Sequence, residues 1–324
     1  MTFKPEMYVE YEELIRDIKS IKIQGATNVA LATLHGIKLI SSKLSDSASQ
    51  SETTDLVKSY GYELANARDN EPLARNGVKY ILYKIGEAGK NLEDGEGNWR
   101  ELLQELCREY IRGIEDAKKR IIENSKGAFS GIEEVRGIMT HCHSSTAVTV
   151  IANYISDNPH VPVVTTETRP LYQGRKTATR LIEKGVDTTM IVDSAAESFI
   201  TDKGSFPIDI LFIGADQITS DGSTINKIGS WGIAFAARSV GDPVYVVTPS
   251  LKLEIDSHKD NVKIEMRDAR EVWPDAPEKL KIINPAFEVI DSELITGYIT
   301  ELGIIDPKDI ASVVKQNYSW LEFE

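Results

Sequence analysis

A thiol and a carboxylate occupy similar places in this chain, and such a pair can move protons in a catalytic site. Cys142 and Asp216 each follow an apolar run of strand length, at a point where small and polar residues begin a helical pattern. In an open α/β sheet, ligands bind in the crevice beyond the carboxyl ends of the strands. Two such side chains converging on one pocket make an enzyme the leading hypothesis.

Cys142 has polar neighbours, which is unusual for a core residue. His141, His143 and Ser144 surround it directly after the strand-like run. A thiol at a helix N-terminus beside imidazoles is expected to have a lowered pKa and more thiolate character. The alternative is a small buried hydrophobic residue, and the pattern leaves both interpretations open. Cys107 lies within an amphipathic helical run and is interpreted as a core residue.

The two histidines beside Cys142 also raise the question of a metal site. No second cluster of cysteine or histidine accompanies them, because the other histidines are isolated, at His35, His160 and His258. A structural zinc site needs about four such ligands, so we expect no metal. The chain also lacks a P-loop and a Gly-x-Gly-x-x-Gly fingerprint, and no nucleotide cofactor is expected.

Asp216 closes the apolar run Ile208–Ala215. A carboxylate at that place can merely cap the following element. Asn226, Lys227 and Gly229 follow shortly afterwards and bring an amide and an ammonium to the same sheet edge. A helix N-terminus with a lysine beside it suits a phosphate. The segment is therefore interpreted as a phosphate-binding turn, with an ordinary glycine turn as the alternative.

Three further loops carry polar groups. The segment Ile23–Asn28 precedes a helical pattern and offers backbone N–H groups to an anion, or simply forms an N-terminal cap. The segments Thr166–Pro170 and Gln173–Lys176 follow another strand-like run and share the predicted carboxyl edge with Cys142. Their alternative is a solvated charged loop.

Composition limits the function classes. The 324 residues suffice for two domains, and 41% hydrophobic and 27% charged residues are ordinary for a soluble globular protein. The net charge of −13, from 37 basic and 50 acidic residues, argues against nucleic acid as a partner. A local basic cluster still suits an anionic substrate, because distant charges are screened. Two cysteines, no signal peptide and no membrane-length apolar run predict a cytoplasmic protein that does not bind membranes.

Periodicity predicts a helical domain over residues 1–130 and a Rossmann-like domain over residues 131–324. Helical spacing of apolar residues predicts helices over Tyr8–Ser20, Asn28–Leu44, Glu71–Lys90 and Arg100–Ile122, with loops at Ser41–Thr54 and Asp94–Asn98. Short β-branched runs then alternate with helical stretches, which indicates an α/β fold with a mainly parallel sheet. The predicted strands are Gly137–Thr140, Val161–Thr166, Met190–Asp193, Ile208–Ile213 and Val244–Val247.

Several motifs, taken in order, resemble one protein family. This family joins archaeal ribose-1,5-bisphosphate isomerases, methylthioribose-1-phosphate isomerases and the regulatory subunits of the eukaryotic initiation guanine-nucleotide exchange factor. The resemblance runs from about Ile23 to Pro307, and the bisphosphate isomerase branch is the most similar. The motifs that carry it are Ile138–Ser144, Thr166–Pro170, Val192–Ala196, Ile225–Gly229, Glu265–Asp268 and Asn284–Phe287.

The resemblance implies an aldose–ketose isomerase that converts ribose 1,5-bisphosphate to ribulose 1,5-bisphosphate in AMP breakdown. It implies that Cys142 accepts the proton from C2 and that Asp216 donates a proton to the ring oxygen. It also implies a homo-oligomer, either a dimer or a hexamer. The remaining matched positions would bind the substrate: Ser144, Ser145 and Thr146 along it, Asn226 and Lys227 holding it, Arg68 and Lys252 at phosphate or sugar oxygens, and Gln24, Gly25, Ala26 and Thr27 as a phosphate loop.

The chain departs from the family pattern at one end of the expected substrate. Gln24 stands where the family usually has arginine, and the residues after Arg68 also differ. Loss of a bidentate phosphate ligand weakens a phosphate site, so a related sugar 1-phosphate is an alternative substrate. Methylthioribose-1-phosphate isomerase and a non-catalytic regulatory subunit are alternative functions. Retention of both Cys142 and Asp216 favours an enzyme.

Overall fold

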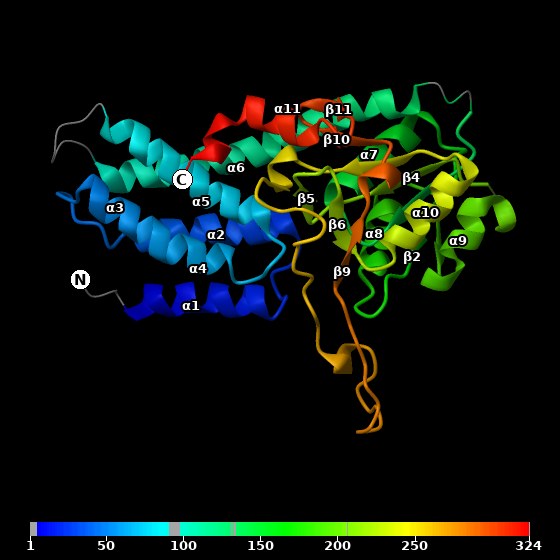
Figure 1. Ribbon diagram of the computed structural model, residues 1–324, viewed down its shortest axis with the longest axis horizontal. Helices are drawn as coiled ribbons and strands as arrows, with labels where there is room; N and C mark the ends of the chain where they lie inside the picture. Colours follow the sequence, from blue (N-terminus) through cyan, green and yellow to red (C-terminus); the bar gives the residue numbers. More distant parts are fainter. Residues whose placement is uncertain (1–4, 91–97, 131, 133, 206, 324) are drawn as a thin grey trace. The chain divides into compact units, whose positions relative to one another are not determined.

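The computed structural model describes residues 5–90, 98–130, 132, 134–205 and 207–323. It divides into two compact units (Figure 1). The first unit comprises residues 1–116, 251–255 and 313–324, and the second comprises residues 117–250 and 256–312. The division thus falls within a helix before the predicted boundary at residue 130, and two later stretches of chain return to the helical unit.

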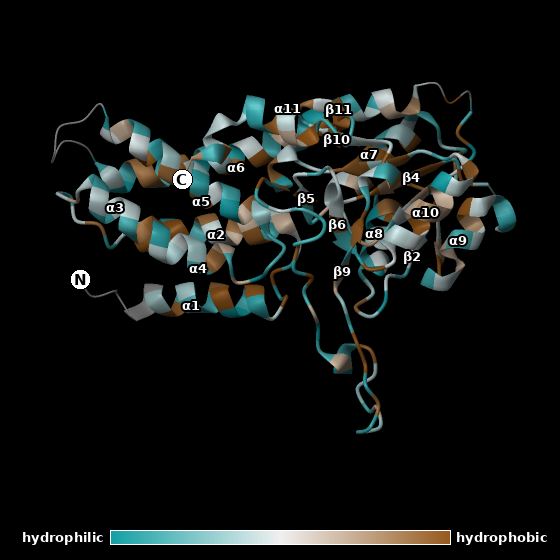
Figure 2. Cartoon of the chain, viewed as in Figure 1, coloured by the Kyte–Doolittle hydropathy of each residue, from teal (hydrophilic) through white to brown (hydrophobic). Residues whose placement is uncertain are grey.

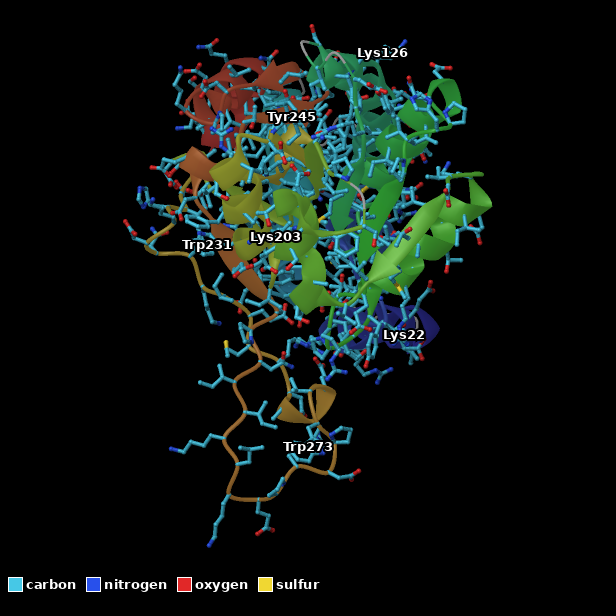
Figure 3. The ribbon with its side chains drawn as sticks, turned by 90° about the vertical axis from the view of Figure 1, so that its right-hand side faces the viewer. Lys22, Lys126, Lys203, Trp231, Tyr245 and Trp273 are labelled. Carbon is cyan, nitrogen blue, oxygen red and sulfur yellow. The ribbon has the colours of Figure 1, made fainter. Side chains whose placement is uncertain are left out.

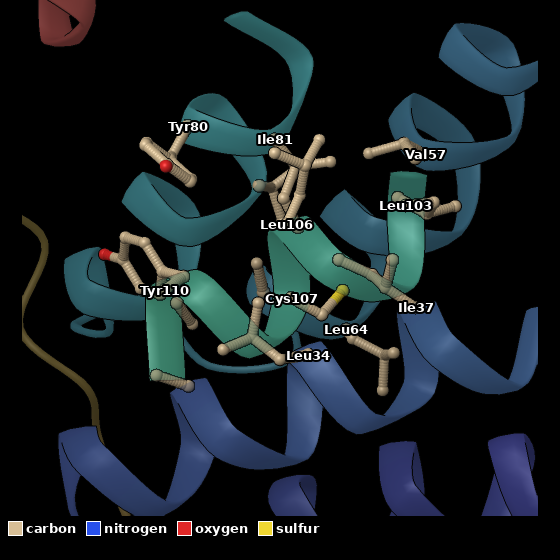
Figure 4. Packing of buried hydrophobic residues seen from close by; sticks show 14 of the residues in the cluster. Leu34, Ile37, Val57, Leu64, Tyr80, Ile81, Leu103, Leu106, Cys107 and Tyr110 are labelled. Carbon is tan, nitrogen blue, oxygen red and sulfur yellow. The ribbon is translucent and has the colours of Figure 1, made fainter. Parts of the chain in front are cut away.

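The first unit is helical, and the four helices predicted from periodicity are confirmed. Its apolar side chains meet in one core, where Leu34, Ile37, Ile81 and Leu103 are fully or almost fully buried (Figure 4). Cys107 is buried in the same core, which confirms its interpretation. The helices of this part of the chain are α1 (Pro5–Lys19), α2 (Ala26–Ser41), α3 (Gln50–Leu56), α4 (Tyr62–Ala65), α5 (Pro72–Gly89) and α6 (Trp99–Asn124).

The loop predicted over Ser41–Thr54 is shorter than expected, because α3 begins within it. Ser49 is the N-cap of α3: its hydroxyl accepts the backbone N–H of Glu52, and the Glu52 carboxylate accepts the N–H of Ser49 at 2.8 Å. This reciprocal pair satisfies two N–H groups that a helix start otherwise leaves without a partner. Residues 94–97 of the other predicted loop lie outside the described residues.

Two distant stretches of chain complete the first unit. The side chain of Asn76 donates to the carbonyl oxygens of Leu251 and Leu253 at 2.8 and 2.9 Å. Near the other end of the chain, the Trp320 ring packs on Tyr80 with centroids 5.3 Å apart, and Leu321 is fully buried. Both stretches lie far from the helices in sequence, and the helical periodicity carries no sign of them.

The second unit contains a seven-stranded sheet with the order β11-β10-β7-β4-β1-β2-β3, in which only β11 is antiparallel to its neighbour. The prediction of a mainly parallel, Rossmann-like sheet is confirmed, and the five predicted strands all form. These strands are β1 (Ile138–His141), β2 (Val163–Thr166), β3 (Thr188–Ile191), β4 (Ile210–Ile213) and β7 (Val244–Val247), joined by β10 (Gly297–Thr300) and β11 (Gly303–Ile305).

Helices alternate with these strands, as expected for a parallel sheet whose connections must cross over. The central strands β1, β2 and β4 are buried along their whole length, and Figure 2 shows the apolar colour of β4 against the mixed colours of the helices. Such continuous apolar strands are typical of a sheet that is covered on both faces. The helices are α7 (Ser145–Asp157), α8 (Gln173–Glu183), α9 (Ala196–Ser198), α10 (Ser230–Val240) and α11 (Ile310–Asn317).

The strand that follows β4 in the sequence, β5 (Gln217–Thr219), belongs to a smaller antiparallel sheet, which the sequence pattern did not predict. Strand β6 (Thr224–Lys227) pairs with β5 on one side and with β9 (Phe287–Ile290) on the other. The short strand β8 (Leu253–Glu254) belongs to a stretch of the first unit. Among the described residues, no helix is long and apolar enough to cross a membrane.

The middle of the stretch 256–285 projects from the rest of the second unit (Figures 1 and 3), whereas its start is bonded to that unit through Ser257 and Lys259. The stretch contains little regular structure, with one short 3-10 turn at Ala269–Glu271. Large apolar side chains of the stretch are exposed: Met266 by 57%, Trp273 by 49%, Leu280 by 48% and Ile283 by 79%. We call residues 256–285 the arm below.

Candidate active site

Cys142 and Asp216 follow two neighbouring strands at the point where the order of the strands reverses. The chain runs from β1 outward through β2 to β3, and then returns to the other side of β1 with β4. His141 at the end of β1 is opposite Ile213 at the end of β4. Ligands of doubly wound sheets bind at this switch point, so the strand order brings the thiol and the carboxylate to the edge of the sheet where a ligand is expected.

The backbone of Cys142 is held in an unusual conformation. Its φ of 66° lies in the left-handed region that residues other than glycine seldom adopt. Two hydrogen bonds hold it there: the Cys142 N–H donates to Thr168 Oγ1 at 3.1 Å, and Thr177 Oγ1 donates to the Cys142 carbonyl at 2.6 Å. Thr168 also has a positive φ, of 62°. Strained residues of this kind cluster at functional sites, and here two of them face each other.

A buried chain of hydrogen bonds leads from this backbone to the His141 ring, and its proton positions follow from the partners. Nε2 of His141 lies 2.9 Å from the carbonyl of Ile228, which only accepts, so Nε2 carries the proton. Nδ1 then accepts from Thr166 Oγ1 at 2.6 Å, and Thr166 accepts from Thr168 at 3.3 Å. Burial lowers the pKa of His141, so this ring is neutral.

His143 is also neutral. Because the Thr177 hydroxyl gives its proton to the Cys142 carbonyl, its oxygen accepts from Nδ1 of His143, 2.9 Å away. Burial, with smaller contributions from the positive charges of Lys176 and Arg180, lowers the pKa of His143 to about 4. Neither imidazole therefore supplies the positive charge that the sequence led us to expect beside the thiol.

The predicted lowering of the Cys142 pKa is wrong for the protein alone. Burial is the main cause that raises the pKa of this thiol, with smaller contributions from the negative charges of Asp216 and Asp193, and the pKa is about 11. Lys227 acts in the opposite direction and is the largest lowering influence, followed by the His143 backbone N–H. The desolvation of the thiolate outweighs these favourable interactions. Cys142 is thus a thiol whose ionisation depends on the charges of Asp216 and Lys227.

The N-terminus of α7 lies beside Cys142 and carries three of the predicted substrate residues. Ser144 is its N-cap and accepts the N–H of Ala147 at 3.2 Å; Ser145 is exposed, and Thr146 is buried. A Cβ on Gly214 would lie 2.8 Å from Ser144 Cβ. Only glycine therefore allows the end of β4 to approach α7 this closely.

Asn226 and Lys227 end β6 and lead into α10. The Asn226 amide donates to Ser230 Oγ at 2.8 Å, and the Lys227 ammonium lies 4.6 Å from the centroid of the Phe287 ring. The α10 N-terminus already holds an anion, because Glu288 Oε1 accepts the N–H groups of Gly229 and Trp231 at 2.6 and 2.9 Å. A phosphate bound at this N-terminus, as the sequence suggested, would meet that carboxylate, so this interpretation is wrong.

The other predicted substrate residues belong to the first unit. Gln24 and Gly25 are exposed, and Gly25 is the N-cap of α2 with a φ of 86°. Ala26 and Thr27 form the first turn of α2, and Lys252 lies half-buried in the stretch 251–255.

Arg68, the last of the predicted substrate residues, pairs with Glu71 at 3.0 Å, and the two side chains are only 9% and 2% exposed. The structure therefore brings Cys142, Asp216, Ser144–Thr146, Asn226 and Lys227 into one unit, while Gln24–Thr27, Arg68 and Lys252 are parts of the other.

Sequence reasoning assigned no individual role to the residues that hold these groups in place. Asp193 accepts the N–H groups of Thr168 and Arg169, both at 2.7 Å, and so fixes the loop that contacts Cys142. Thr166 was named only within the segment Thr166–Pro170, and Thr177 and Glu288 were not singled out. The threonines at the end of β2 are the available signal, since polar side chains at a carboxyl edge often line or support a site. Glu288 has no local signal, because its partners lie in a different strand and helix.

The fold is a doubly wound α/β sheet, and a thiol and a carboxylate lie at its switch point. The protein therefore has the groups needed for acid–base chemistry. Residues 22–307 match the model of the Initiation factor 2 subunit family, and the chain belongs to that family. It is 32% identical to the ribose 1,5-bisphosphate isomerase of Archaeoglobus fulgidus, covering 97% of this chain and 96% of that protein. It is also 31% identical to the methylthioribose-1-phosphate isomerase of Pelotomaculum thermopropionicum, covering 92% and 83%.

Among solved structures, a translation initiation factor eIF-2B of Pyrococcus horikoshii OT3 superposes with a TM-score of 0.76, covering 92% of this chain and 97% of that one. At 24% sequence identity, this superposition shows a shared fold. The two curated relatives are named as isomerases, and this chain is an enzyme of that class.

Proposed function

We propose that the chain converts ribose 1,5-bisphosphate to ribulose 1,5-bisphosphate by acid–base catalysis at Cys142 and Asp216. The observation that carries this proposal is the placement of the two groups after β1 and β4, at the switch point of the sheet. The Archaeoglobus relative, similar over nearly the whole chain, bears the name of this activity. The reaction would serve AMP breakdown in the cytoplasm, and both cysteines are free thiols, as a reducing compartment requires.

The proposed steps leave both groups unchanged at the end. Asp216 gives its proton to the ring oxygen as the bond from that oxygen to C1 breaks. The Cys142 thiolate takes the proton from C2, and a C1–C2 double bond forms, giving an enol. The C2 hydroxyl of the enol then returns a proton to Asp216 as the carbonyl forms at C2, while Cys142 delivers its proton to C1. Positioned proton transfer of this type contributes about 10²–10⁴-fold to a rate.

These roles require the proton to reside on Asp216 while Cys142 is ionised. The charges of the site support this distribution: protonation of Asp216 removes a negative charge that raises the pKa of the thiol, and Lys227 favours the thiolate. Protonation of Asp216 and ionisation of Cys142 would therefore favour each other.

The substrate contacts are proposed from the matched positions. Ser144, Ser145 and Thr146 at the start of α7 would donate to one phosphate, which suits a helix N-terminus. In the first unit, the loop Gln24–Thr27 with Arg68 and Lys252 would contact the other phosphate and sugar oxygens. The ion pair of Arg68 with buried Glu71 neutralises part of the positive charge available to that phosphate. A different sugar phosphate, without a phosphate at this distal end, is therefore the alternative substrate.

A product assay tests the proposal directly. The purified protein is incubated with ribose 1,5-bisphosphate, methylthioribose 1-phosphate and ribose 1-phosphate, and the ketose product is measured. We expect ribulose 1,5-bisphosphate, a loss of at least about 10²-fold in Cys142→Ser, and binding without turnover in Asp216→Asn. Turnover close to that of the parent protein in either folded variant would overturn the proposed roles, and Cys107→Ser is the matched control.

Methylthioribose-1-phosphate isomerase is a second candidate. It is favoured by 31% identity to the Pelotomaculum relative and by Gln24, which offers a neutral amide to the distal end of the substrate. A higher kcat/KM for methylthioribose 1-phosphate in the same assay would establish it. Absence of turnover with all three compounds would instead favour a non-catalytic regulatory subunit.

We also propose that the chain forms a homo-oligomer through the arm. Four large apolar side chains are exposed there (Figure 3 labels Trp273), and such surfaces are usually buried in an assembly. A dimer, or a hexamer built from three dimers, is expected by light scattering after size exclusion. Replacing Trp273 and Ile283 by serine should lower the molar mass to that of smaller species; an unchanged mass would place the interface elsewhere.

A further inference from the structure

Glu288 occupies a helix N-terminus that otherwise would be open to an anion. It lies in β9 opposite Asn226 of β6, and its carboxylate turns to the start of α10. Oε1 accepts the N–H of Gly229 at 2.6 Å and that of Trp231 at 2.9 Å. Since α10 has 11 residues, these N–H groups lie at the positive end of a helix dipole. The chain thus supplies its own anion at this place.

The opposite side of the same turn is held by His141. Its Nε2–H donates to the carbonyl of Ile228 at 2.9 Å. Gly229 has a φ of 103°, and a Cβ there would lie 3.1 Å from Cε1 of the His141 ring. The turn between β6 and α10 is therefore fixed between an imidazole of β1 and a carboxylate of β9, with little space to shift.

The Lys227 side chain lies at the end of β6, where the strand leads into this turn. Lys227 directly precedes Ile228, and its Nζ is 4.6 Å from the ring centroid of Phe287, the neighbour of Glu288 in β9. Successive residues of a strand point to opposite faces, so β9 holds Lys227 with one face and the α10 N-terminus with the other. Lys227 is also the main group that opposes the effect of burial on the thiol of Cys142.

We propose that Glu288 is a positioning residue for the isomerisation: it fixes the turn 227–231 so that the Lys227 ammonium stays within reach of the Cys142 thiol. The effect on catalysis rests on the proposed function above. The effect on the thiol itself is a property of the protein without substrate, and the two are measured separately.

The sign of the effect distinguishes this role from direct electrostatics. The groups that act on the thiol are Lys227, Asp216, Asp193 and the N–H of His143. If Glu288 acted on Cys142 through its own negative charge, its removal would favour the thiolate. If it acts by holding Lys227 in place, its removal disfavours the thiolate, because the positive charge moves away.

The experiment compares Glu288→Ala and Glu288→Gln with the parent protein. The rate of alkylation by iodoacetamide at about pH 8 reports the thiolate fraction of Cys142, and Cys107 is fully buried and does not interfere. We expect alkylation at least about threefold slower in Glu288→Ala, a fall in kcat of about tenfold or more with a smaller change in KM, and recovery of both on addition of acetate. Glu288→Gln keeps an acceptor for the N–H groups, though a weaker one, and is expected to lie between the two.

Asp291→Asn is the matched control. Asp291 is also a carboxylate that contacts α10, but it accepts from the Trp231 side chain at 3.1 Å and not from the helix N–H groups; its variant should alkylate and turn over like the parent. Equal or faster alkylation in folded Glu288→Ala overturns the proposal, and if that variant does not fold, the same result in Glu288→Gln does so. A parent protein without isomerase activity would refute the proposed function, while the alkylation rates still decide the role of Glu288.

Discussion

Cys142 should react slowly with alkylating reagents until the pH is high. Its pKa is raised from 9.0 to about 11, so at neutral pH it holds about a hundredfold less thiolate than a free cysteine. A more basic thiolate is also more nucleophilic, which returns about tenfold over two pKa units. The net expectation is alkylation about tenfold slower than that of a small thiol at the same pH.

Mass spectrometry after timed exposure to iodoacetamide gives this rate between about pH 7 and pH 10. Two charge variants test the origin of the shift. Lys227→Met removes the cation that favours the thiolate and should slow the reaction, whereas Asp216→Asn removes a carboxylate that disfavours it and should speed the reaction.

Cys107, whose pKa burial raises to about 12, serves as an internal unreactive thiol. An apparent pKa of about 8.5 or lower for Cys142, close to or below that of an unperturbed thiol, would refute the conclusion that burial dominates at this sulfur. Responses of equal sign in Lys227→Met and Asp216→Asn would refute the assignment of the two charges.

Three further outcomes are expected. The reactive form, with a Cys142 thiolate and a protonated Asp216, holds as many protons as the form with a thiol and a carboxylate. The value of kcat/KM should therefore be flat from neutral pH upward and fall near the thiol pKa of about 11. A tenfold rise in kcat/KM per pH unit would exclude Asp216 as the acid. Gln24→Arg should lower KM for ribose 1,5-bisphosphate by about tenfold if ~1.4 kcal/mol is gained, with less gain in high salt; an unchanged preference over ribose 1-phosphate would remove this loop from the distal phosphate. The pKa of His143 is lowered from 6.5 to about 4, so the unfolded chain binds the proton first and the folded protein loses stability as the pH falls from 6.5 to about 4. Over this pH range the melting temperature of His143→Gln should fall less than that of the parent. Parallel plots of melting temperature against pH for the two proteins would contradict this argument.

The helices and parallel strands were predictable because their signals are local. Apolar spacing placed α2, α5 and α6 within a few residues of their observed ends, and β1 and β4 read as short apolar runs bounded by polar residues. Helix α3 was missed because seven residues are too few for a clear period. Its capping pair, Ser49 and Glu52, was nevertheless present as a readable signal.

The antiparallel sheet was not predictable in the same way. Strands β5 and β6 are short and polar, and β6 pairs with β9, which lies beyond the arm in sequence. Pairing between such distant segments leaves no periodic pattern in either of them. The same limit explains why the α10 N-terminus was predicted to suit a phosphate, since Glu288, which occupies it, lies in β9.

The placement of Cys142 and Asp216 after two neighbouring strands was predictable, and the protonation of the groups around them was not. Cys142 and Asp216 follow strand-like runs, which sufficed to place them at one sheet edge. The charge states depend on burial and on partners from other elements. Thr166 and the Ile228 carbonyl together fix the tautomer of His141, and nothing near His141 in the sequence reveals that its ring would be neutral.

The discontinuous first unit has a consequence for the order in which the protein matures. Its final stretch, residues 313–324, is synthesised after the whole of the second unit, yet it contains the fully buried Leu321 and the ring of Trp320 that packs on Tyr80. A nascent chain therefore carries a helical unit that lacks part of its core until the last residues of the chain are made. Domains generally fold as units during synthesis, and exposed apolar surface makes incomplete ones prone to aggregate. The helical unit is synthesised first and completes its core last, so its exposed apolar core is the surface to which a chaperone would bind.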